Sequence, residues 1–225
     1  MSRAVIFANG ELSDLDSARA LVRADDLIIA ADGGLRHCRA LGLTPHTLIG
    51  DFDSTAPADS AAFETAGTRL VRYPARKDQT DLELALEWAI THGADDIVIL
   101  GALGGRWDQT LANLLLPALP AWNSARIRIV DGRQQISLVR GPGTISLIGS
   151  PGDTVSLIPI GGDAQGITTT GLDYALTNGR LHFGSTLGIS NALIAGEASV
   201  SLHAGLLVCA VIQSSQTSKA QTSEV

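Results

Sequence analysis

Aromatic residues, cysteine and methionine are scarce in this chain of 225 residues. Aromatics make up 4% of the sequence, and there are two cysteines and one methionine. The core must therefore be built mainly from valine, isoleucine, leucine and alanine. Cys38 and Cys209 stand alone, without the spacing of metal ligands or of a redox pair, so we expect two buried, unreactive thiols.

Positive charge and long apolar runs are also in short supply. The chain has 16 Lys and Arg against 23 Asp and Glu, a formal net charge of -7. This balance argues against a general nucleic-acid binder, which needs a basic surface to neutralise phosphates. The longest apolar runs, such as Leu206 to Ile212, are far shorter than the roughly 20 residues that span a bilayer. With no signal-peptide layout at the start, we expect no membrane association and a cytoplasmic protein.

Short apolar strands alternate with helical stretches through residues 1–131. Because the strands are almost continuously apolar, the pattern predicts an α/β domain with a parallel sheet covered on both faces. Ligands bind to such sheets beyond the carboxyl ends of the strands. The expected strands are Ala4–Ala8, Leu27–Ala31, Thr47–Gly50, Arg69–Tyr73, Ile97–Leu100 and Arg126–Val130. The expected helices are Asp14–Arg23, Leu35–Leu41, Asp59–Ala66, Asp81–His92 and Trp107–Leu119.

The character of the sequence changes after Asp131. Residues 132–213 hold strand-like pieces separated by Gly, Asn-Gly and Pro-Gly, without a convincing helical stretch. This pattern predicts a second, all-β domain, a small sandwich or barrel. The polar tail, residues 214–225, is expected to be disordered. The expected strands are Ile136–Val139, Thr144–Ile148, Thr154–Pro159, Gly166–Thr170, Leu181–Phe183, Ser199–His203 and Leu206–Ile212.

Two glycine-rich segments follow strands of the first domain. In Asp32-Gly33-Gly34 the glycines let the backbone turn sharply and approach a ligand, although this segment taken alone favours a simple strand-to-helix turn. In the segment from Gly101 to Asp108, glycines open backbone amides ahead of a helix, which suits an anion. Arg106 adds donors for a phosphate, and a purely structural turn is the alternative.

Two acidic segments follow other strands of the same domain. Asp51 and Asp53 are two residues apart, so in extended chain their carboxylates converge, and Mg²⁺ would relieve their repulsion. The alternative is that Asp53 or Ser54 begins a turn or caps a helix.

In the segment from Lys77 to Glu83, Thr80 with Glu83 fits a capping box, and Asp81 suits the helix dipole. The start of a helix does not explain Lys77 and Asp78. A lysine and two acids that converge there suit the binding of phosphates and of a shared metal ion. Together, the glycine-rich and acidic segments along one sheet edge predict a site for a polyphosphate with Mg²⁺.

Read in order, four segments closely resemble those of the thiamine pyrophosphokinase family. They are FANGE, AADGGLRHCRALGLTPHTLIGDFDS, YPARKDQTDLELAL and LGALGGRWDQTLANLLLP, and GLDYALTNGRLHFGSTLGISN resembles the family's thiamine-binding segment. The resemblance runs to about Ile212. It implies a Rossmann-like nucleotide-binding domain followed by a β-sandwich. It also implies transfer of the pyrophosphoryl group of ATP to the hydroxyl of thiamine, with Mg²⁺, in a homodimer whose active site lies between subunits.

The resemblance also assigns roles to residues of this chain. Asp51, Asp53 and Asp78 would be the Mg²⁺ ligands, and with Asp81, Lys77 and Arg106 they would form the catalytic set. Ser190, Asn191 and Gln109 would lie near thiamine, although Ser190 and Asn191 also suit a turn before a strand. The nucleotide side would be lined by Asp32, Gly33, Gly34, Gly101, Gly104, Gly105, Arg106 and Asp108.

Some features of the resemblance leave alternatives open. The family often has histidine where this chain has Gln109, and glutamine can position a group but cannot titrate near neutral pH. Trp107 and Tyr174 would either stack on a ligand ring or belong to the core. The rival functions are a pyrophosphokinase for another alcohol such as a hydroxymethylpterin, a non-catalytic thiamine or nucleotide sensor, and a metal phosphohydrolase.

Overall fold

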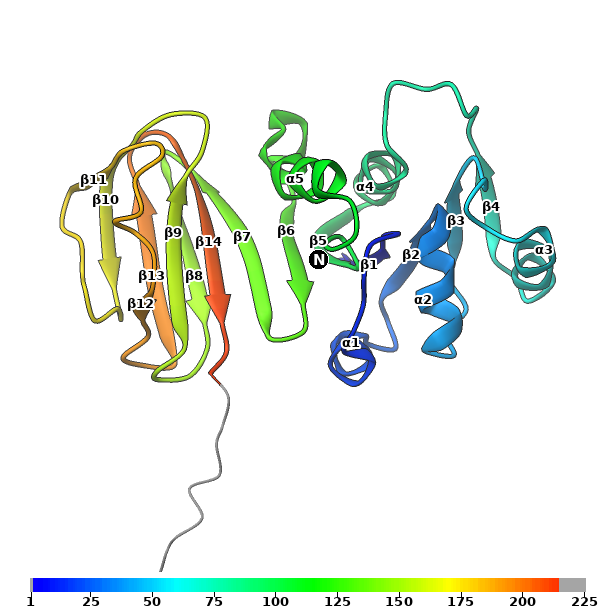
Figure 1. The fold of residues 1–225 in the computed structure, drawn as a ribbon, viewed down its shortest axis with the longest axis horizontal. Coiled ribbons are helices and arrows are strands. Elements are labelled where there is room, and N and C mark those ends of the chain that lie inside the picture. Colours follow the sequence, from blue (N-terminus) through cyan, green and yellow to red (C-terminus); the bar gives the residue numbers. More distant parts are fainter. Residues whose placement is uncertain (1, 215–225) are drawn as a thin grey trace, which may run out of the picture. The chain divides into compact units, whose positions relative to one another are not determined.

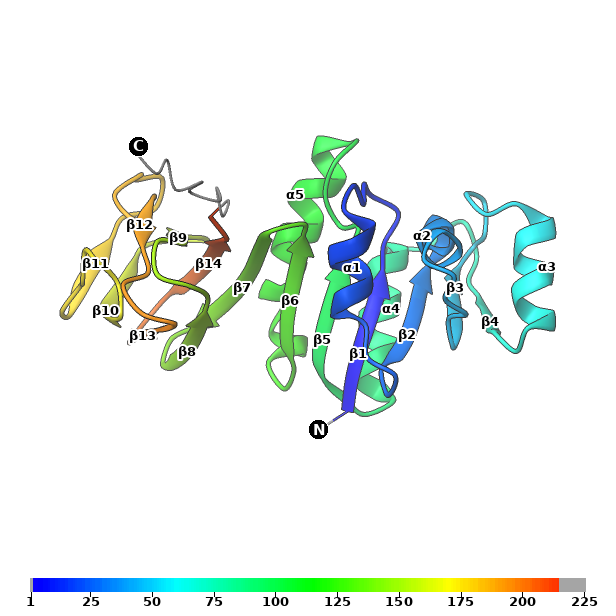
Figure 2. The ribbon, with the colours of Figure 1, turned by 90° about the horizontal axis from the view of Figure 1, so that it is seen from below.

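The computed structural model describes residues 2–214 (Figures 1 and 2). They form two compact units that divide between Leu138 and Val139. The boundary expected from sequence, Asp131, is the last residue of β6, whereas the division falls within the next strand, β7 (Gln134–Arg140). Apart from Ser214, the tail that the sequence predicts to be disordered lies outside the described residues.

The first unit is built on a largely parallel sheet. Its strands are β1 (Ser2–Phe7), β2 (Leu27–Ala31), β3 (Thr47–Gly50), β4 (Arg69–Arg72), β5 (Ala94–Leu100), β6 (Arg126–Asp131) and β7 (Gln134–Arg140). Within this unit their order is β7-β6-β5-β1-β2-β3-β4. All neighbouring pairs are parallel except β6 with β7. The predicted parallel sheet is confirmed, and the carboxyl ends of β1 to β6 share one edge.

Helices cover both faces of this sheet (Figures 1 and 2). They are α1 (Leu15–Leu21), α2 (Leu35–Ala40), α3 (Pro57–Thr65), α4 (Asp81–Thr91) and α5 (Trp107–Leu115). Alternate residues of β1 point to opposite faces, so Ile6 packs in the cluster that contains α4, and Phe7 packs in the cluster that contains α1 and α2. This double burial is why the strands read as continuous apolar runs.

Helix α5 ends four residues earlier than the sequence pattern predicts. A short 3-10 helix, Leu116–Ala118, follows it. The cause is Pro117, which has no N–H to donate to the carbonyl four residues earlier, so the α-helical ladder of hydrogen bonds stops there. No helix among residues 2–214 is long and apolar enough to cross a membrane.

The second unit contains strands and no helix among its described residues, as predicted. Its strands are β8 (Gly143–Ile148), β9 (Thr154–Pro159), β10 (Ala164–Thr170), β11 (Gly179–Leu181), β12 (Asn191–Ala192), β13 (Glu197–Leu202) and β14 (Leu206–Ile212). They pair antiparallel in the orders β11-β10-β13-β8 and β12-β9-β14. Side chains of both groups, such as Val200 and Val155, meet in one apolar cluster.

Both cysteines lie in apolar clusters, as expected. Cys38 packs between α2 and the sheet of the first unit, and Cys209 lies in the core of the second. Burial raises the pKa of each thiol to about 12. At neutral pH neither is a thiolate, so neither is a nucleophile.

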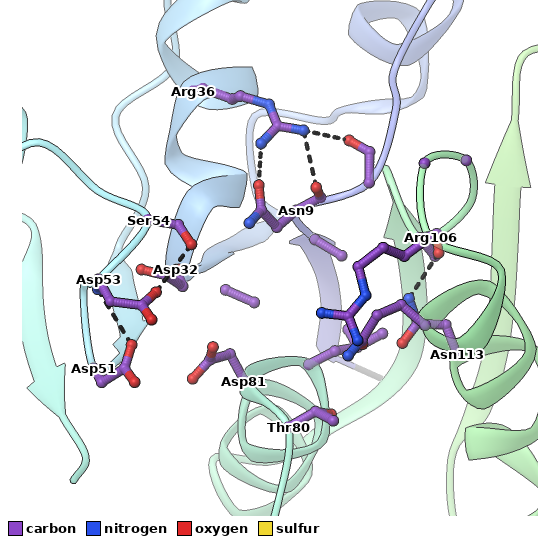
Figure 3. Close-up of a pocket in the computed structure, with 18 of the residues that line it drawn as sticks. Asn9, Asp32, Arg36, Asp51, Asp53, Ser54, Thr80, Asp81, Arg106 and Asn113 are labelled. Carbon is purple, nitrogen blue, oxygen red and sulfur yellow. Dashed lines mark hydrogen bonds between the residues drawn. The ribbon is translucent and has the colours of Figure 1, made fainter. Parts of the chain in front are cut away.

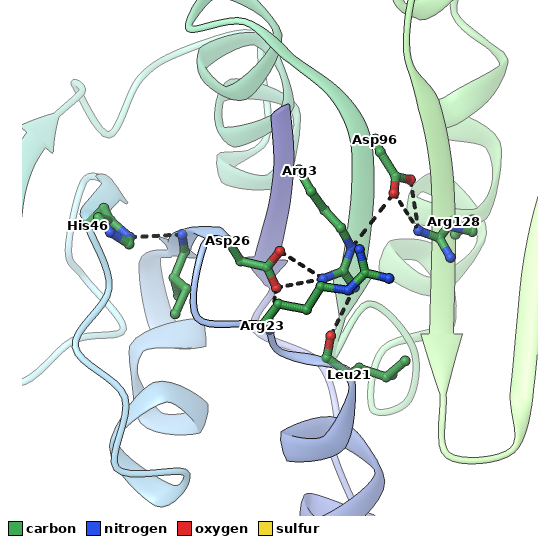
Figure 4. Close-up of polar contacts among 8 residues, drawn as sticks. Arg3, Leu21, Arg23, Asp26, His46, Asp96 and Arg128 are labelled. Carbon is green, nitrogen blue, oxygen red and sulfur yellow. Dashed lines mark hydrogen bonds and ion pairs between the residues drawn. The ribbon is translucent and has the colours of Figure 1, made fainter. Parts of the chain in front are cut away.

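A buried ion pair fixes the amino-terminal edge of the parallel sheet (Figure 4). Arg3 Nη1 donates to both carboxylate oxygens of Asp26, at 2.8 and 2.6 Å, and Arg3 Nη2 donates to the carbonyl of Leu21. The Asp26 side chain is fully buried and that of Arg3 is 10% exposed. Asp96 lies 3.7 Å from Arg3 Nε and also pairs with Arg128. The first strand is thereby tied to the segment that precedes β2.

Replacing Asp26 with asparagine should lower the free energy of unfolding by about 3 kcal/mol, because it leaves the buried Arg3 charge without its main partner. Urea unfolding measures the effect. The control is Asp25→Asn, which makes the same change of charge at an exposed neighbour and should alter stability by less than about 0.5 kcal/mol. Equal stability of the two variants would contradict the assigned role of the ion pair.

Candidate functional site

A cleft of about 620 Å³ opens at the carboxyl edge of the parallel sheet (Figure 3). This volume is typical of small-molecule sites. Segments that follow β1, β2, β3, β4 and β5 line it, as expected for ligand binding to a parallel sheet. The predicted site residues among its lining are Asp32, Asp51, Asp53, Lys77, Asp81, Gly104, Gly105, Arg106 and Gln109.

Three carboxylates meet on one side of the cleft. Asp32, Asp51 and Asp53 each offer an oxygen, and these oxygens all lie within 4.8 Å of one another. Asp32 is buried in a left-handed conformation with φ 41°, and Thr55 Oγ1 donates to its Oδ1 at 3.2 Å. The Asp53 amide donates to Asp51 Oδ1 at 3.2 Å, which fixes the second carboxylate. Converging carboxylate oxygens are the donors that a hard divalent cation prefers.

The third member of this cluster differs from the one the sequence suggested. Asp78, named with Asp51 and Asp53 as a metal ligand, is exposed and is not among the residues that line the cleft. Asp32, which the sequence placed on the nucleotide side, lies with Asp51 and Asp53 in this cluster. The order of the sheet explains this, because β2 and β3 are neighbours and the residues that follow them come together.

Gly50 allows the carboxylates to approach. Its φ is 151°, and a Cβ at this position would lie 2.9 Å from Asp32 Cβ and 3.1 Å from Asp81 Oδ1. A side chain here would have to displace one of these acids. The glycine at the end of β3 therefore sets how closely the start of α4 packs against the cluster.

Lys77 supplies positive charge to this acidic region. Its Nζ lies 2.7 Å from Asp81 Oδ1 and 3.9 Å from Asp51 Oδ2. Burial by itself lowers the pKa of Lys77, but the contact with Asp81 and the nearby negative charges outweigh burial and raise it. The pKa of Asp81 is raised chiefly by burial, against the attraction of Lys77. Lys77 is thus a firmly charged ammonium, and Asp81 is more basic than an exposed aspartate.

The start of α4 confirms part of the predicted capping box. Thr80 is the N-cap, and its hydroxyl accepts a hydrogen bond from the Glu83 amide at 3.2 Å. The Glu83 carboxylate accepts from Gln79 Nε2 at 3.3 Å. Thr80 and Glu83 therefore have a structural explanation, although Thr80 also lines the cleft with Lys77 and Asp81.

Sequence reasoning assigned no role to the loop after β1, which also lines the cleft. Arg36 of α2 donates to Asn9 Oδ1 and to the carbonyls of Asn9 and Gly10 (Figure 3). His37 is buried, and burial lowers its pKa, so the neutral ring donates from Nε2 to the Gly10 carbonyl at 2.9 Å. The available signal was the polar run Asn9-Gly10-Glu11 directly after an apolar strand.

The loops after β1 and β5 are joined by backbone hydrogen bonds. The Gly10 amide donates to the Gly101 carbonyl at 2.6 Å, and the Glu11 amide donates to the Leu103 carbonyl at 2.7 Å. A Cβ on Gly10 would lie 2.4 Å from the Leu103 carbonyl oxygen, so only glycine fits. The two loops thus form one wall of the cleft.

Three of the glycines that the sequence placed on the nucleotide side do not line the cleft. They allow close packing around the end of β1 and the loop that follows it. A Cβ on Gly33 would meet Asn9 Oδ1 at 2.3 Å, one on Gly34 would meet the Phe7 carbonyl at 1.9 Å, and one on Gly101 would meet the Ala8 carbonyl at 2.8 Å. Their absent side chains let neighbouring segments lie directly against the end of β1. They act here as close-packing positions that hold the loop after β1 in place.

Arg106 faces the carboxylates across the cavity (Figure 3). Its guanidinium also binds Asp108 in a bidentate pair, at 3.1 and 2.5 Å. That pair lowers the pKa of Asp108 to about 2, and Asp108 is not among the residues that line the cleft. Asp108 therefore acts on the site through Arg106. Trp107 is 82% exposed, which excludes the alternative that it belongs to the core.

The residues predicted for thiamine, Ser190 and Asn191, lie in the second unit. Asn191 Oδ1 accepts from the Tyr174 amide at 3.0 Å, and its Nδ2 donates to the Tyr174 carbonyl at 2.8 Å. The Tyr174 ring is 74% exposed, so it is not a core residue. Ser190 has φ 62°, and its amide donates to Ser156 Oγ at 3.1 Å. Asn191 therefore fixes the backbone of Tyr174, a residue whose side chain is exposed.

Comparison with known proteins gives consistent results for both units. Residues 18–130 match the family model for the thiamin pyrophosphokinase catalytic domain, and residues 143–207 match that for its vitamin B1 binding domain. Thiamine pyrophosphokinase of Bacillus subtilis is 36% identical over 81% of this chain and 85% of its own length. A crystal structure of thiamine pyrophosphokinase from Bacillus subtilis superposes with a TM-score of 0.82, at 30% identity, over 95% of this chain and all of the other. The enzyme of Geobacillus thermodenitrificans gives a TM-score of 0.81 at 32% identity, over 96% and 99%.

Proposed function

The chain belongs to the thiamin pyrophosphokinase family, and we propose that the cleft of its first unit binds ATP and carries out the transfer. The protein is an ATP:thiamine diphosphotransferase, which converts ATP and thiamine into AMP and thiamine diphosphate. One observation carries the assignment of the site. A cluster of three carboxylates lies in the same cleft as Lys77, Arg106 and the two glycines before Arg106.

The fold supports a division of labour between the two units. We infer that the first, expected from sequence at residues 1–131, is a Rossmann-like ATP domain, because its parallel strands present the cleft at their carboxyl ends. The second, expected at residues 132–213, is inferred to be a β-sandwich that binds thiamine. Its two groups of antiparallel strands share one apolar core.

The donor set of the cluster fits Mg²⁺. Asp32, Asp51 and Asp53 provide hard carboxylate oxygens at converging positions, and their mutual repulsion favours a divalent cation between them. Asp78 remains a proposed ligand from the family resemblance. When bound, Mg²⁺ would offset the negative charge of the polyphosphate.

The residues of the chain have separate tasks in the proposed transfer. Arg106, Lys77 and the amides of Gly104 and Gly105 hold the phosphates and align the β-phosphorus with the thiamine hydroxyl. A bond forms between the hydroxyl oxygen and the β-phosphorus, and the bond from that phosphorus to the α–β bridging oxygen breaks. AMP leaves with the electron pair. Asp81 is proposed to accept the hydroxyl proton, because its carboxylate lines the cleft beside Lys77 at the start of α4.

The acceptor site is proposed to lie between two subunits of a homodimer. Gln109, Ser190 and Asn191 would bind thiamine, with Tyr174 stacking on one of its rings. Support comes from the exposure of Tyr174 and from the two hydrogen bonds by which Asn191 fixes the Tyr174 backbone. The match of residues 143–207 to the vitamin B1 binding model favours thiamine over another alcohol, and the match to the catalytic model favours an enzyme over a sensor.

An assay of AMP release tests the function. The purified protein with ATP and Mg²⁺ should release AMP when thiamine is added and little without it. AMP release with a hydroxymethylpterin but not with thiamine would overturn the acceptor. Release of phosphate without any acceptor would indicate a phosphohydrolase instead.

Replacing Arg106 with alanine should raise the KM for ATP about tenfold or more, because one charged hydrogen bond to phosphate contributes roughly 1.5–3 kcal/mol. The KM for thiamine should stay within about twofold, since the thiamine ring carries no phosphate for Arg106 to bind. Steady-state kinetics measure both constants. Arg39→Ala is the matched control, because Arg39 is an exposed arginine paired with Asp59 and does not line the cleft. An unchanged ATP dependence with a raised thiamine requirement would place Arg106 on the acceptor side.

A further inference from the structure

Glu11 has a position in the cleft that the proposed mechanism does not use. Its Oε1 accepts a hydrogen bond from the Gly105 amide at 3.1 Å. Glu11, Gly104 and Gly105 all line the cleft. The carboxylate of one loop thus holds an amide of the other, at the glycine turn proposed to bind phosphate.

The glycine turn is shaped to receive this side chain. Gly104 has φ 86° and Gly105 has φ 65°, both in the left-handed region. A Cβ on Gly104 would lie 2.7 Å from Cγ and Cδ of Glu11, so the Glu11 side chain rests directly on the Gly104 backbone. The Glu11 backbone is fixed as well, because its N–H donates a hydrogen bond to the Leu103 carbonyl at 2.7 Å. Both the side chain and the backbone of Glu11 are therefore held against the loop that contains the glycine turn.

The cationic side chains of the cleft also have acceptors within the described chain. Lys77 pairs with Asp81, Arg106 pairs with Asp108, and Arg36 donates to Asn9 and Gly10. A polyphosphate must compete with these internal acceptors. At Gly105 the competition is direct, because one N–H serves one acceptor well and two anionic groups on it repel each other.

We propose that Glu11 is an internal anion that occupies a phosphate position on the glycine turn and is displaced when ATP binds. This inference rests on the proposed function, since it takes ATP as the ligand of the cleft. Glu11 keeps the Gly104–Gly105 turn in place before ATP binds. Its charge lowers the affinity for polyphosphate, and the affinity for an uncharged nucleoside is unaffected. Glu11 is a positioning residue and takes no part in bond making.

Replacing Glu11 with glutamine separates charge from hydrogen bonding, because the amide oxygen can still accept from Gly105. We expect the Kd for ATP, measured by titration calorimetry with Mg²⁺, to fall about three- to tenfold at low salt, and the Kd for adenosine to stay unchanged. The gain should shrink as salt rises, since screening weakens charge repulsion. Glu64→Gln is the matched control. It makes the same change at an exposed position of α3 outside the cleft and should leave both constants unchanged.

The alternatives give different results. If Glu11 only braces the loop, Glu11→Gln will leave ATP affinity unchanged, and Glu11→Ala will lower thermal stability with the same loss for ATP and adenosine. If Glu11 is a metal ligand, Glu11→Gln will weaken ATP binding and raise the Mg²⁺ requirement. Either outcome overturns the inference. Failure of the wild-type protein to bind ATP would overturn the proposed function itself, and that result appears before any variant is compared.

Discussion

Turnover should fall at least about 100-fold when Asp51 or Asp53 is replaced with asparagine, a loss in the range seen when an electrostatic group of an active site is removed. The physical reason is the geometry of the cluster, where oxygens of Asp32, Asp51 and Asp53 lie within 4.8 Å of one another. Each substitution removes a charged oxygen ligand and keeps the shape of the side chain. Measurement of kcat over a Mg²⁺ titration checks the prediction, and half-saturation should move to higher Mg²⁺.

Stability should not fall together with activity in these variants. Removing one of three mutually repelling charges relieves repulsion, so without Mg²⁺ the free energy of unfolding should stay equal or rise slightly. Asp59→Asn is a suitable control, because Asp59 pairs with Arg39 on the surface and does not line the cleft. Near-normal turnover with an unchanged Mg²⁺ dependence in both cluster variants would contradict the metal assignment.

Two inactive variants should restore activity when their subunits mix. One carries Asp51→Asn in the first unit, and the other carries Asn191→Ala, which removes both hydrogen bonds that hold the Tyr174 backbone. If each active site combines the first unit of one subunit with the second unit of the other, a mixed dimer contains one active site with both substitutions and one with neither. Random mixing makes half of the dimers mixed, so about a quarter of the wild-type activity should return.

Subunit exchange must be verified independently, for example with two affinity tags. The control is Asp51→Asn mixed with Asp53→Asn, which should stay inactive because both lesions belong to the same half of the site. A verified mixed dimer of the first pair that remains as inactive as its parents would contradict the proposed shared site.

The parallel sheet could be predicted because its cause is local. The central strands β1, β2, β3 and β5 are buried on both faces over most of their length, and double burial produces short, continuous apolar runs such as Ile97–Leu100. The helices between them carry apolar residues at helical spacing. The end of α5 was misplaced because the apolar pattern continues past Pro117, whose effect on the backbone outweighs the pattern.

The site could be predicted only where the chemistry sits in a short segment. Asp51 with Asp53, and Lys77 with Asp81, stand close together in the chain at the ends of strands. Arg36 lies within a helix and reaches the cleft by binding the loop after β1, so no local spacing reveals it. The contribution of Asp32 to the carboxylate cluster depends on the pairing of β2 with β3, which periodicity does not determine.

The fate of the two terminal phosphates of ATP tests the central claim most directly. ATP labelled at both the β- and γ-phosphorus is incubated with thiamine, Mg²⁺ and the protein, and the products are separated and identified. Transfer of an intact pyrophosphoryl group predicts that both labels appear in thiamine diphosphate, with one unlabelled AMP formed for each. Label in free phosphate or pyrophosphate without thiamine diphosphate, or thiamine monophosphate formed together with ADP, would contradict the account.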